Sequence, residues 1–419
     1  MTIKLQLLHV THQYPPAIGG SEKYIADLSE ELVKRGHHVD VFTSRSCDYN
    51  TWQSELPHFE ERNGVKVYRF NSMQRRNYVW QILHFGLRNY WRTRSWRYEP
   101  FVFFGGGPIS PSMFYAILKH GKKYDVIHLN CLVYGHVTYG QLAASWLNVP
   151  SVITPHAHIT QEETFNIGYQ QKTMRAADYV IADTEAERDV LLESGLNAWQ
   201  VSVVGVGLKL DNFQPQSKNV SMLQARQQFN LPQNAFVILF LGRKAEYKGL
   251  NTVLEAYSTV KSQHSQAVML AVGPDTDYSN QLMAQYNHVP DIHTFGKVSH
   301  TDKLAALQAC DCLVLPSKGE AFGIVYLEAW LMEKAVIGSR VPAVASLINE
   351  GQDGLLIEYG NSYDLATCIN YLIANPEQAH QMGKHGRRKV LQRYTMENTT
   401  DRLEGIYLRV LRHRQQGKH

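Results

Sequence analysis

The sequence has few cysteines, no long apolar run and no strong charge of either sign. Its five cysteines among 419 residues are odd in number, which suits a reducing compartment better than a disulfide framework. No stretch approaches the roughly 18 uninterrupted apolar residues of a membrane-spanning helix, and the first residues lack the basic and apolar regions of a secretion signal. We therefore expect a cytoplasmic protein, and the sequence leaves open a peripheral position at the inner face of the membrane.

The residues that are present indicate a folded α/β protein. Apolar residues make up 44% and charged residues 19% of the chain, with a formal net charge of +4. Short apolar runs alternate with helical patterns on both sides of a break near residue 206, which predicts two parallel-sheet domains, 1–205 and 206–395. The expected strands are residues 5–10, 38–43, 65–70, 125–130, 151–156, 179–184 and 201–205, then 236–243, 267–273, 292–296, 312–317, 335–339 and 355–358.

The turn after the first expected strand contains two glycines, Gly19 and Gly20. An apolar stripe predicts a helix over 21–35, ended by Gly36. Small residues before a helix let a ligand approach the backbone amides, and the amino end of the helix suits phosphate. A glycine turn without a ligand explains the pair equally well.

Charged side chains stand at two other turns. Arg243 and Lys248 directly follow an expected buried strand, where they could hold a diphosphate or lie in a solvated turn. Glu320 precedes an expected helix, and Glu328 follows eight residues later among apolar side chains. Sugar hydroxyls would be a partner for Glu320 and ribose hydroxyls for Glu328, since a buried carboxylate needs one. The alternatives are a helix-terminus charge for Glu320 and an internal salt bridge for Glu328.

Several segments together resemble glycosyltransferase family four, whose members are retaining enzymes with the GT-B fold. PAIGGSEKYIADLSEELVKRGHHVDVFT resembles the family's opening glycine loop, helix and second strand, GRKAEYKG its G-R-x4-K-G motif, and SKGEAFGIVYLEA its E-x7-E motif. The likeness covers nearly the whole chain. It implies two Rossmann-like domains facing across a cleft, with a closing helix at about 396–419 that packs back on the first domain. VGVGLKLDNF departs from the family's usual Pro-Asn-Gly-Val/Ile-Asp.

The resemblance also implies roles for individual residues. Arg243 and Lys248 would hold and stabilise the leaving diphosphate, Glu320 would hold hydroxyls of the donated sugar, and His156 would lie near that sugar. A purely structural role is the alternative for His156, a lone histidine at a strand end. The residues implied to bind the donor are Gly19, Gly20, Phe322, Gly323 and Glu328.

The expected cofactor requirement is none. Arg243 and Lys248 already supply positive charge to the diphosphate, so we expect no metal, and the nucleotide-diphosphate sugar of UDP or GDP type is a co-substrate. Asp275-Thr276-Asp277 is a D-x-D sequence, which in the other glycosyltransferase fold holds a divalent cation, and it is the alternative.

Residues 75–99 interleave arginines with aromatic residues and contain no acid before Glu99. This composition suits an anionic membrane surface or a lipid-linked acceptor. The expected acceptor or membrane surface comprises Arg88, Trp91, Arg92 and Arg94. The alternative is a helical pair whose aromatic residues pack on the core. We expect no nucleic-acid partner, since no nucleic-acid-binding module surrounds the segment.

The sequence therefore predicts a retaining, metal-independent hexosyltransferase. It would move a sugar from a nucleotide-diphosphate sugar to a glycan or lipid-linked acceptor, in cell-envelope or exopolysaccharide synthesis. A nucleotide-sugar epimerase on the same fold and a non-catalytic nucleotide-sugar-binding protein stay open as alternatives. A dinucleotide oxidoreductase is disfavoured, because no strand is followed by the glycine fingerprint.

Overall fold

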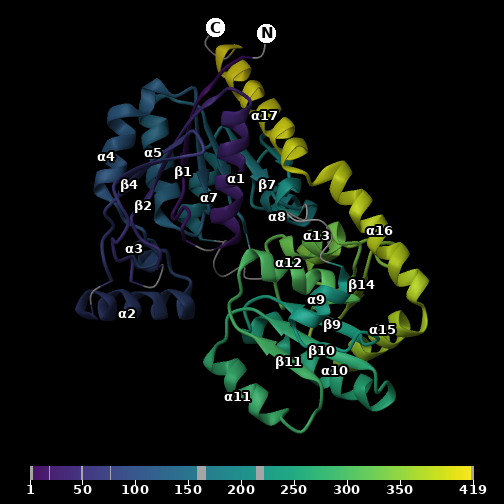
Figure 1. Cartoon of the computed structure of the whole chain (residues 1–419). Helices are drawn as coiled ribbons and strands as arrows, with labels where there is room; N and C mark the ends of the chain where they lie inside the picture. The colour runs from purple at the N-terminus through teal and green to yellow at the C-terminus, as the bar shows by residue number, and fades with distance from the viewer. Residues whose placement is uncertain are drawn as a thin grey trace. The chain divides into compact units, whose positions relative to one another are not determined.

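A computed structural model describes residues 3–17, 19–48, 51–75, 77–157, 167–213 and 221–416. The chain divides into two units (Figure 1). Unit 1 comprises Met1–Gly207 and Met396–His419, and unit 2 comprises Leu208–Thr395. Each unit has its own sheet flanked by helices.

The sheet of unit 1 has the strand order β3-β4-β2-β1-β5-β6-β7-β8. All neighbours are parallel except β3 and β4. The strands are β1 (Gln6–Val10), β2 (His38–Ser44), β3 (Phe59–Arg62), β4 (Val65–Phe70), β5 (Val126–Asn130), β6 (Ser151–Thr154), β7 (Tyr179–Ala182) and β8 (Val201–Val203). The seven predicted strands of this half are confirmed, and β3 is an edge strand that the sequence did not predict.

The sheet of unit 2 has the order β11-β10-β9-β12-β13-β14 and is parallel throughout. Its strands are β9 (Phe236–Leu241), β10 (Ala267–Val272), β11 (Ile292–Phe295), β12 (Cys312–Leu315), β13 (Ala335–Ser339) and β14 (Leu355–Ile357). Every residue of β10 is buried, as expected for a parallel strand covered on both faces by helices. All six predicted strands of this half are confirmed.

Helices connect the strands in both units. Those of unit 1 are α1 (Gly20–Lys34), α2 (Asn77–Thr93), α3 (Glu99–Gly106), α4 (Pro111–His120), α5 (Gly135–Leu147), α7 (Gly168–Arg175), α8 (Glu185–Glu193) and α17 (Met396–Gln416). Those of unit 2 are α9 (Met222–Gln228), α10 (Leu250–Gln263), α11 (Asp277–Gln285), α12 (His300–Ala309), α13 (Ile324–Leu331), α14 (Pro342–Leu347), α15 (Ser362–Ala374) and α16 (Pro376–Arg393). The predicted end of α1 is confirmed, because Gly36 follows it with φ +94°.

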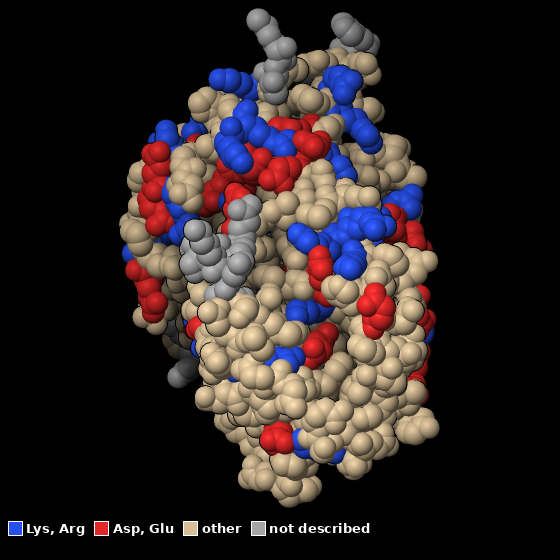
Figure 2. Space-filling model, turned by 45° about the vertical axis from the view of Figure 1, so that its right-hand side comes forward, with Lys and Arg blue, Asp and Glu red and all other residues tan. Residues whose placement is uncertain are grey.

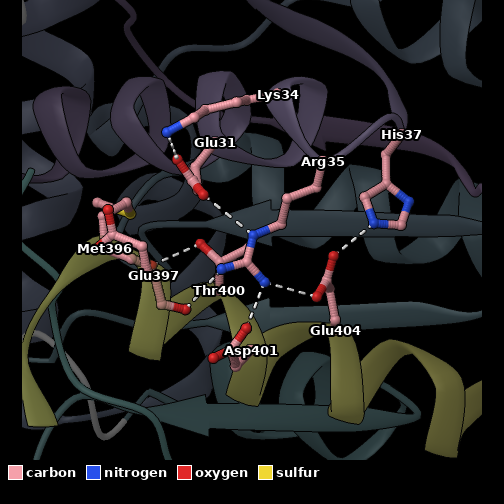
Figure 3. Close-up of polar contacts among 9 residues, drawn as sticks. All are labelled: Glu31, Lys34, Arg35, His37, Met396, Glu397, Thr400, Asp401 and Glu404. Atoms are coloured by element: carbon pink, nitrogen blue, oxygen red, sulfur yellow. Dashed lines mark hydrogen bonds and ion pairs between the residues drawn. The ribbon is translucent and has the colours of Figure 1, made fainter. Parts of the chain in front are cut away.

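A cluster of charged side chains fastens α17 to the end of α1 (Figure 3). The Arg35 guanidinium lies 2.5 Å from Asp401 and 2.8 Å from Glu404, both on α17, and 3.1 Å from Glu31 on α1. His37 Nε2 lies 2.7 Å from the other oxygen of Glu404. Figure 1 shows the two helices side by side, one at each end of the colour scale.

Tyr407 fastens the same helix to the middle of the sheet. Its buried hydroxyl lies 2.7 Å from Nδ1 of His128 on β5 and 3.3 Å from Nε2 of His9 on β1. His9 also meets Ser29 of α1 at 2.8 Å. Ser29, His9, Tyr407 and His128 therefore form one buried chain of hydrogen bonds between α1, α17 and the sheet, as is usual for buried polar groups.

The surface matches the small net charge. On the face shown in Figure 2, patches of Lys and Arg interleave with patches of Asp and Glu. Among the described residues, no single helix has the length and apolar composition of a membrane span. A bent pair, Trp96–Gly106 and Pro111–Lys123, passes that test only when taken together, and its two parts differ in direction by 88°.

Candidate functional site

The carboxyl ends of β9 and β12 bring a lysine and a carboxylate together in unit 2. The two strands are neighbours in the sheet, so the loops that follow them meet. Lys248 Nζ lies 2.6 Å from Glu320 Oε1, and Ser317 Oγ donates to the same oxygen at 2.7 Å. The backbone N–H of Lys318 donates to the carbonyl of Tyr247 at 2.7 Å, which joins the two loops directly.

Gly249 explains how closely these loops approach. It has φ +76°, and a Cβ at this position would lie 2.2 Å from the Pro316 carbonyl oxygen. Any other residue would force the loop after β9 away from the loop after β12. Gly249 also follows the short 3₁₀ turn Glu246–Lys248, so it fixes the position from which Lys248 reaches Glu320.

Glu328, the buried acid of α13, has a protein partner. Its Oε1 lies 2.5 Å from Nζ of Lys303 on α12. The internal salt bridge that the sequence left open is therefore present. Glu320 and Glu328 are both buried, at 7% and 6% exposure. The binding of ribose by Glu328 stays a prediction.

The amino end of α13 lies beside Glu320. Gly323 caps the helix with φ +89° and supplies no side-chain hydrogen bond, so first-turn amides remain as donors. The Phe322 side chain is buried, with its ring centroid 5.5 Å from that of Tyr394. The side chain of Phe322 is therefore taken up by packing, and the binding of the donor by Phe322 stays a prediction.

The residue after Arg243 is a buried lysine, and it binds the first aspartate of the D-x-D sequence. Arg243 is exposed at the end of β9, whereas the next residue, Lys244, is fully buried. Nζ of Lys244 lies 2.8 Å from Asp275 and donates to Thr294 at 2.5 Å. Thr276, between the two aspartates, caps α11. Asp275 thus has a structural partner, and no group of three metal-ligating residues occurs in the described parts of the chain.

The glycine turn of unit 1 accommodates a buried acid. Gly19 is the residue before α1, and a Cβ there would lie 2.0 Å from Oε2 of Glu22. Glu22 Oε1 lies 3.0 Å from His12 Nε2. Burial would raise the pKa of Glu22, but the hydrogen bond from His12 and its charge outweigh burial and lower that pKa to about 2. Gly20 is the first residue of α1.

His156 forms a buried pair with Asp183. His156 follows β6, Asp183 follows the adjacent β7, and Nδ1 of the histidine lies 2.7 Å from Oδ2 of the aspartate. The side chains are 10% and 1% exposed. Nε2 of His156 is buried without a hydrogen-bond partner among the described residues. His156 also has φ +52°, an unusual conformation for a residue other than glycine.

Other polar side chains at the same edge of this sheet were missed from the sequence. His12 and Gln13 follow β1, Asn130 ends β5, and His136 begins α5; each has a buried side-chain nitrogen with no hydrogen-bond partner in the described ranges. Tyr134 stacks on His12 with ring centroids 4.0 Å apart. Their position directly after buried strands, where ligands of parallel sheets bind, could have identified them from the sequence.

Comparison with known families covers both units. The family described as "Glycosyl transferase 4-like domain" matches residues 19–207, and "Glycosyl transferases group 1" matches residues 221–389. The chain belongs to the group 1 glycosyltransferases. The family resemblance found in the motifs is thereby confirmed.

Known relatives of this glycosyltransferase support the fold and the family. A D-inositol 3-phosphate glycosyltransferase of Corynebacterium urealyticum is 25% identical, covering 93% of this chain and 90% of its own. The structure of sucrose-phosphate synthase from Thermosynechococcus elongatus has a TM-score of 0.75 at 21% identity, covering 97% of this chain and 99% of its own. HepE of Anabaena in complex with UDP-glucose has a TM-score of 0.70 at 19% identity, covering 96% and 99%. These likenesses confirm the predicted GT-B fold.

In the glycosyltransferase, the arginine–aromatic segment has an inner and an outer face. Tyr90 is buried and forms a small core with Val102 and Ile167, against which the half-buried Trp91 packs. The Arg94 guanidinium lies 4.8 Å from the ring centroid of Trp91. The aromatic residues of the inner face therefore pack on a core, as the alternative of a helical pair predicts.

The outer face of α2 is apolar and exposed. Tyr78, Ile82 and Phe85, which share one side of the helix, are 64%, 63% and 62% exposed. Arg88 and Arg92, further along α2, are exposed as well. A helix with outward apolar side chains and neighbouring arginines has the composition of an interfacial helix.

Proposed function

We propose that this glycosyltransferase is a retaining, metal-independent hexosyltransferase that uses a nucleotide-diphosphate sugar, with UDP preferred. The contact between Lys248 and Glu320 carries the proposal, because it brings a cation and a buried carboxylate together in the loops ahead of the amino end of α13. The preference for UDP is supported by the likeness to HepE, whose structure contains UDP-glucose.

The chemistry assigned to these residues is stabilisation of a leaving group. Arg243 and Lys248 neutralise the diphosphate as its bond to the sugar breaks, and contacts of this kind are worth about 3 kcal/mol each. Glu320 binds sugar hydroxyls. Its Oε1 already accepts from Lys248 and Ser317, which lowers its nucleophilicity, so we do not assign it a covalent role. His156 is the residue of unit 1 assigned to the reacting sugar.

The proposed acceptor is a glycan or a lipid-linked saccharide of the cell envelope or an exopolysaccharide. The outward face of α2 supports it, since Tyr78, Ile82 and Phe85 would enter a membrane interface while Arg88 and Arg92 meet anionic headgroups. The enzyme would then be cytoplasmic and peripheral at the inner face of the membrane. A phosphorylated cyclitol is the second candidate acceptor, favoured by the D-inositol 3-phosphate relative.

Thermal shift with UDP, GDP, ADP and their sugar conjugates, with and without EDTA, tests the donor proposal. We expect a selective rise in Tm for one nucleotide that EDTA leaves unchanged. Product NMR with an acceptor then reads the anomeric configuration, and retention is expected. Incubation with donor alone separates the epimerase, which would convert it, and binding without any turnover would favour a non-catalytic protein. An EDTA-sensitive shift would contradict metal independence.

A further inference from the structure

One carboxyl group holds both halves of the His156–Asp183 pair. Glu187, on α8, is fully buried. Its Oε1 accepts from the backbone N–H of Ala157 at 2.8 Å, and its Oε2 accepts from the backbone N–H of Asp183 at 2.6 Å. The loop after β6 and the loop after β7 are thus tied to the same side chain.

This arrangement exceeds what capping of α8 requires. Thr184 already caps the helix, because its side chain accepts from the N–H of Glu187. A glutamate at this third helical position usually reaches back to the capping residue itself. Glu187 instead spans to Ala157, 30 residues away in sequence. Burying an acid is costly. The hydrogen bond to Ala157, the residue after His156, therefore indicates that Glu187 does more than cap α8.

We propose that Glu187 is a positioning residue for the reaction: it fixes Asp183 and the backbone beside His156, so that His156 presents Nε2 to the reacting sugar. The proposal rests on the function proposed above for His156. Asp183 lies on Nδ1, which leaves Nε2 as the ring atom able to meet a ligand, and that atom is buried without a partner among the described residues.

The charges around the pair make the protonation of His156 depend on that of Glu187. Burial lowers the pKa of His156, but Asp183, Glu187 and Glu22 outweigh burial and raise it. Burial, followed by the charge of Asp183, raises the pKa of Glu187 to about 8. Ionisation of Glu187 near pH 8 therefore adds a negative charge that helps to keep His156 protonated.

Groups from several elements face the histidine. The titratable and charged groups around it are Glu22 and Tyr24 of α1, His128 of β5, Asp183 after β7, Glu187 of α8 and, next to Tyr24, Arg402 of α17. Only Glu187 and Asp183 both neighbour His156 and belong to the hydrogen-bonded bridge. The ionisation near pH 8 is assigned to Glu187.

The test is Glu187→Gln, with Glu193→Gln on the exposed end of the same helix as the matched control. The glutamine amide would place an N–H against one of the two backbone N–H donors and shift the loops. At pH 6.5 we expect kcat to fall about tenfold, since small misplacements of catalytic groups are costly, with the KM for the donor unchanged. At pH 9 the deficit should widen, because only the wild type gains the Glu187 charge. Glu193→Gln should match the wild type at both values.

A kcat deficit that is equal at both pH values, or no deficit, would overturn the proposal. If E187Q does not fold, histidine-labelled wild-type enzyme decides by NMR, with His156→Gln used for assignment. A His156 signal that titrates above pH 6.5 and shows a second inflection near pH 8 supports the proposal, and a single midpoint below 6.5 overturns it. This readout needs no turnover, so absence of sugar transfer would refute the proposed function without deciding the role of Glu187.

Discussion

Lys248 and Glu320 are 72 residues apart in the sequence, yet Nζ of the lysine lies 2.6 Å from Oε1 of the carboxylate. The parallel order of β9 and β12 produces this contact, because parallel strands end at the same edge of the sheet. The pair places a positive charge beside a buried carboxylate, and the proposed function assigns the charge to a diphosphate and the carboxylate to sugar hydroxyls.

Lys248→Ala should lower kcat about hundredfold, since one preorganised charge contact is worth about 3 kcal/mol. Tm should fall too, because Glu320 is buried and loses its cation. Adding Glu320→Gln should restore part of the Tm but not kcat. Arg340→Ala, which removes an exposed pair with Glu350, is the control and should change neither. Wild-type kcat in Lys248→Ala would refute the diphosphate assignment.

Glu328→Gln should weaken nucleotide binding more than it changes the preference among sugars. Its comparison is Lys303→Gln, which breaks the same ion pair from the other side. Binding of the nucleotide is measured by calorimetry and stability by Tm. A ribose role predicts that only the glutamate variant loses affinity. Equal losses of Tm with unchanged affinity in both would leave Glu328 a structural residue.

Tyr407→Phe should lower the stability of unit 1 by about 1–3 kcal/mol, because His9 and His128 each lose a buried hydrogen bond. For a domain of about 200 residues, each kcal/mol corresponds to roughly 2–4 °C in Tm. Tyr363→Phe is the control, since Tyr363 is 78% exposed. A Tm equal to that of the wild type would show that the hydroxyl does not fasten α17.

Mild acid should destabilise unit 1 through His9, His128 and His136, the buried histidines whose pKa is lowered. Burial lowers the pKa of His9 from 6.5 to about 3 and places those of His128 and His136 well below 6.5. Below pH 6.5 the unfolded chain therefore binds protons that the folded protein does not, and stability falls by up to about 1.4 kcal/mol per pH unit for each histidine. Thermal unfolding at pH 7, 6 and 5 should show this fall, and His9→Gln should make it shallower. A constant Tm would contradict it.

Association with vesicles containing anionic lipid should depend on the outer face of α2. Replacing Tyr78, Ile82 and Phe85 with serine should abolish sedimentation with the vesicles and leave Tm unchanged, because all three are exposed. Serine at Leu142 and Trp146, exposed apolar residues of α5, is the matched control. Equal sedimentation of all variants would refute membrane binding by the outer face of α2.

Arg88 and Arg92 should contribute mainly to vesicle binding, and Arg94 mainly to stability. Arg88→Ala with Arg92→Ala should weaken vesicle binding, more so at low ionic strength. Arg94→Ala should mainly lower Tm, because this guanidinium lies on the ring of Trp91. Equal effects on vesicle binding from all three would mean that the packing of Arg94 does not set it apart.

The parts of the fold predicted from sequence are those with local signals. Buried strands appear as apolar runs, and Gly36 marks the end of α1. β3 was missed because FEER, residues 59–62, is a polar, mostly exposed edge strand without an apolar run. Where the strands end was predictable as well, which is why Arg243 and Lys248 could be singled out.

The partners of the site residues could not be predicted, because they come from distant parts of the chain. Lys303 reaches Glu328 from another helix, and Asp183 reaches His156 from the loop after another strand. Which face of α2 is buried could not be predicted either. Helical spacing puts Tyr78 and Tyr90 on different sides of the helix, but the packing of α3 determines that Tyr90 is the buried one.

The return of α17 to unit 1 has a consequence for protein synthesis. Residues 208–395 leave the ribosome before Tyr407 does, so residues 1–207 of unit 1 must wait for the whole of unit 2 before His9 and His128 gain their hydroxyl partner. At about 5–20 residues per second this delay is roughly 10–40 s. During that time the nascent chain carries an incomplete hydrophobic core, the state that chaperones recognise, while unit 2 is free to fold as it emerges.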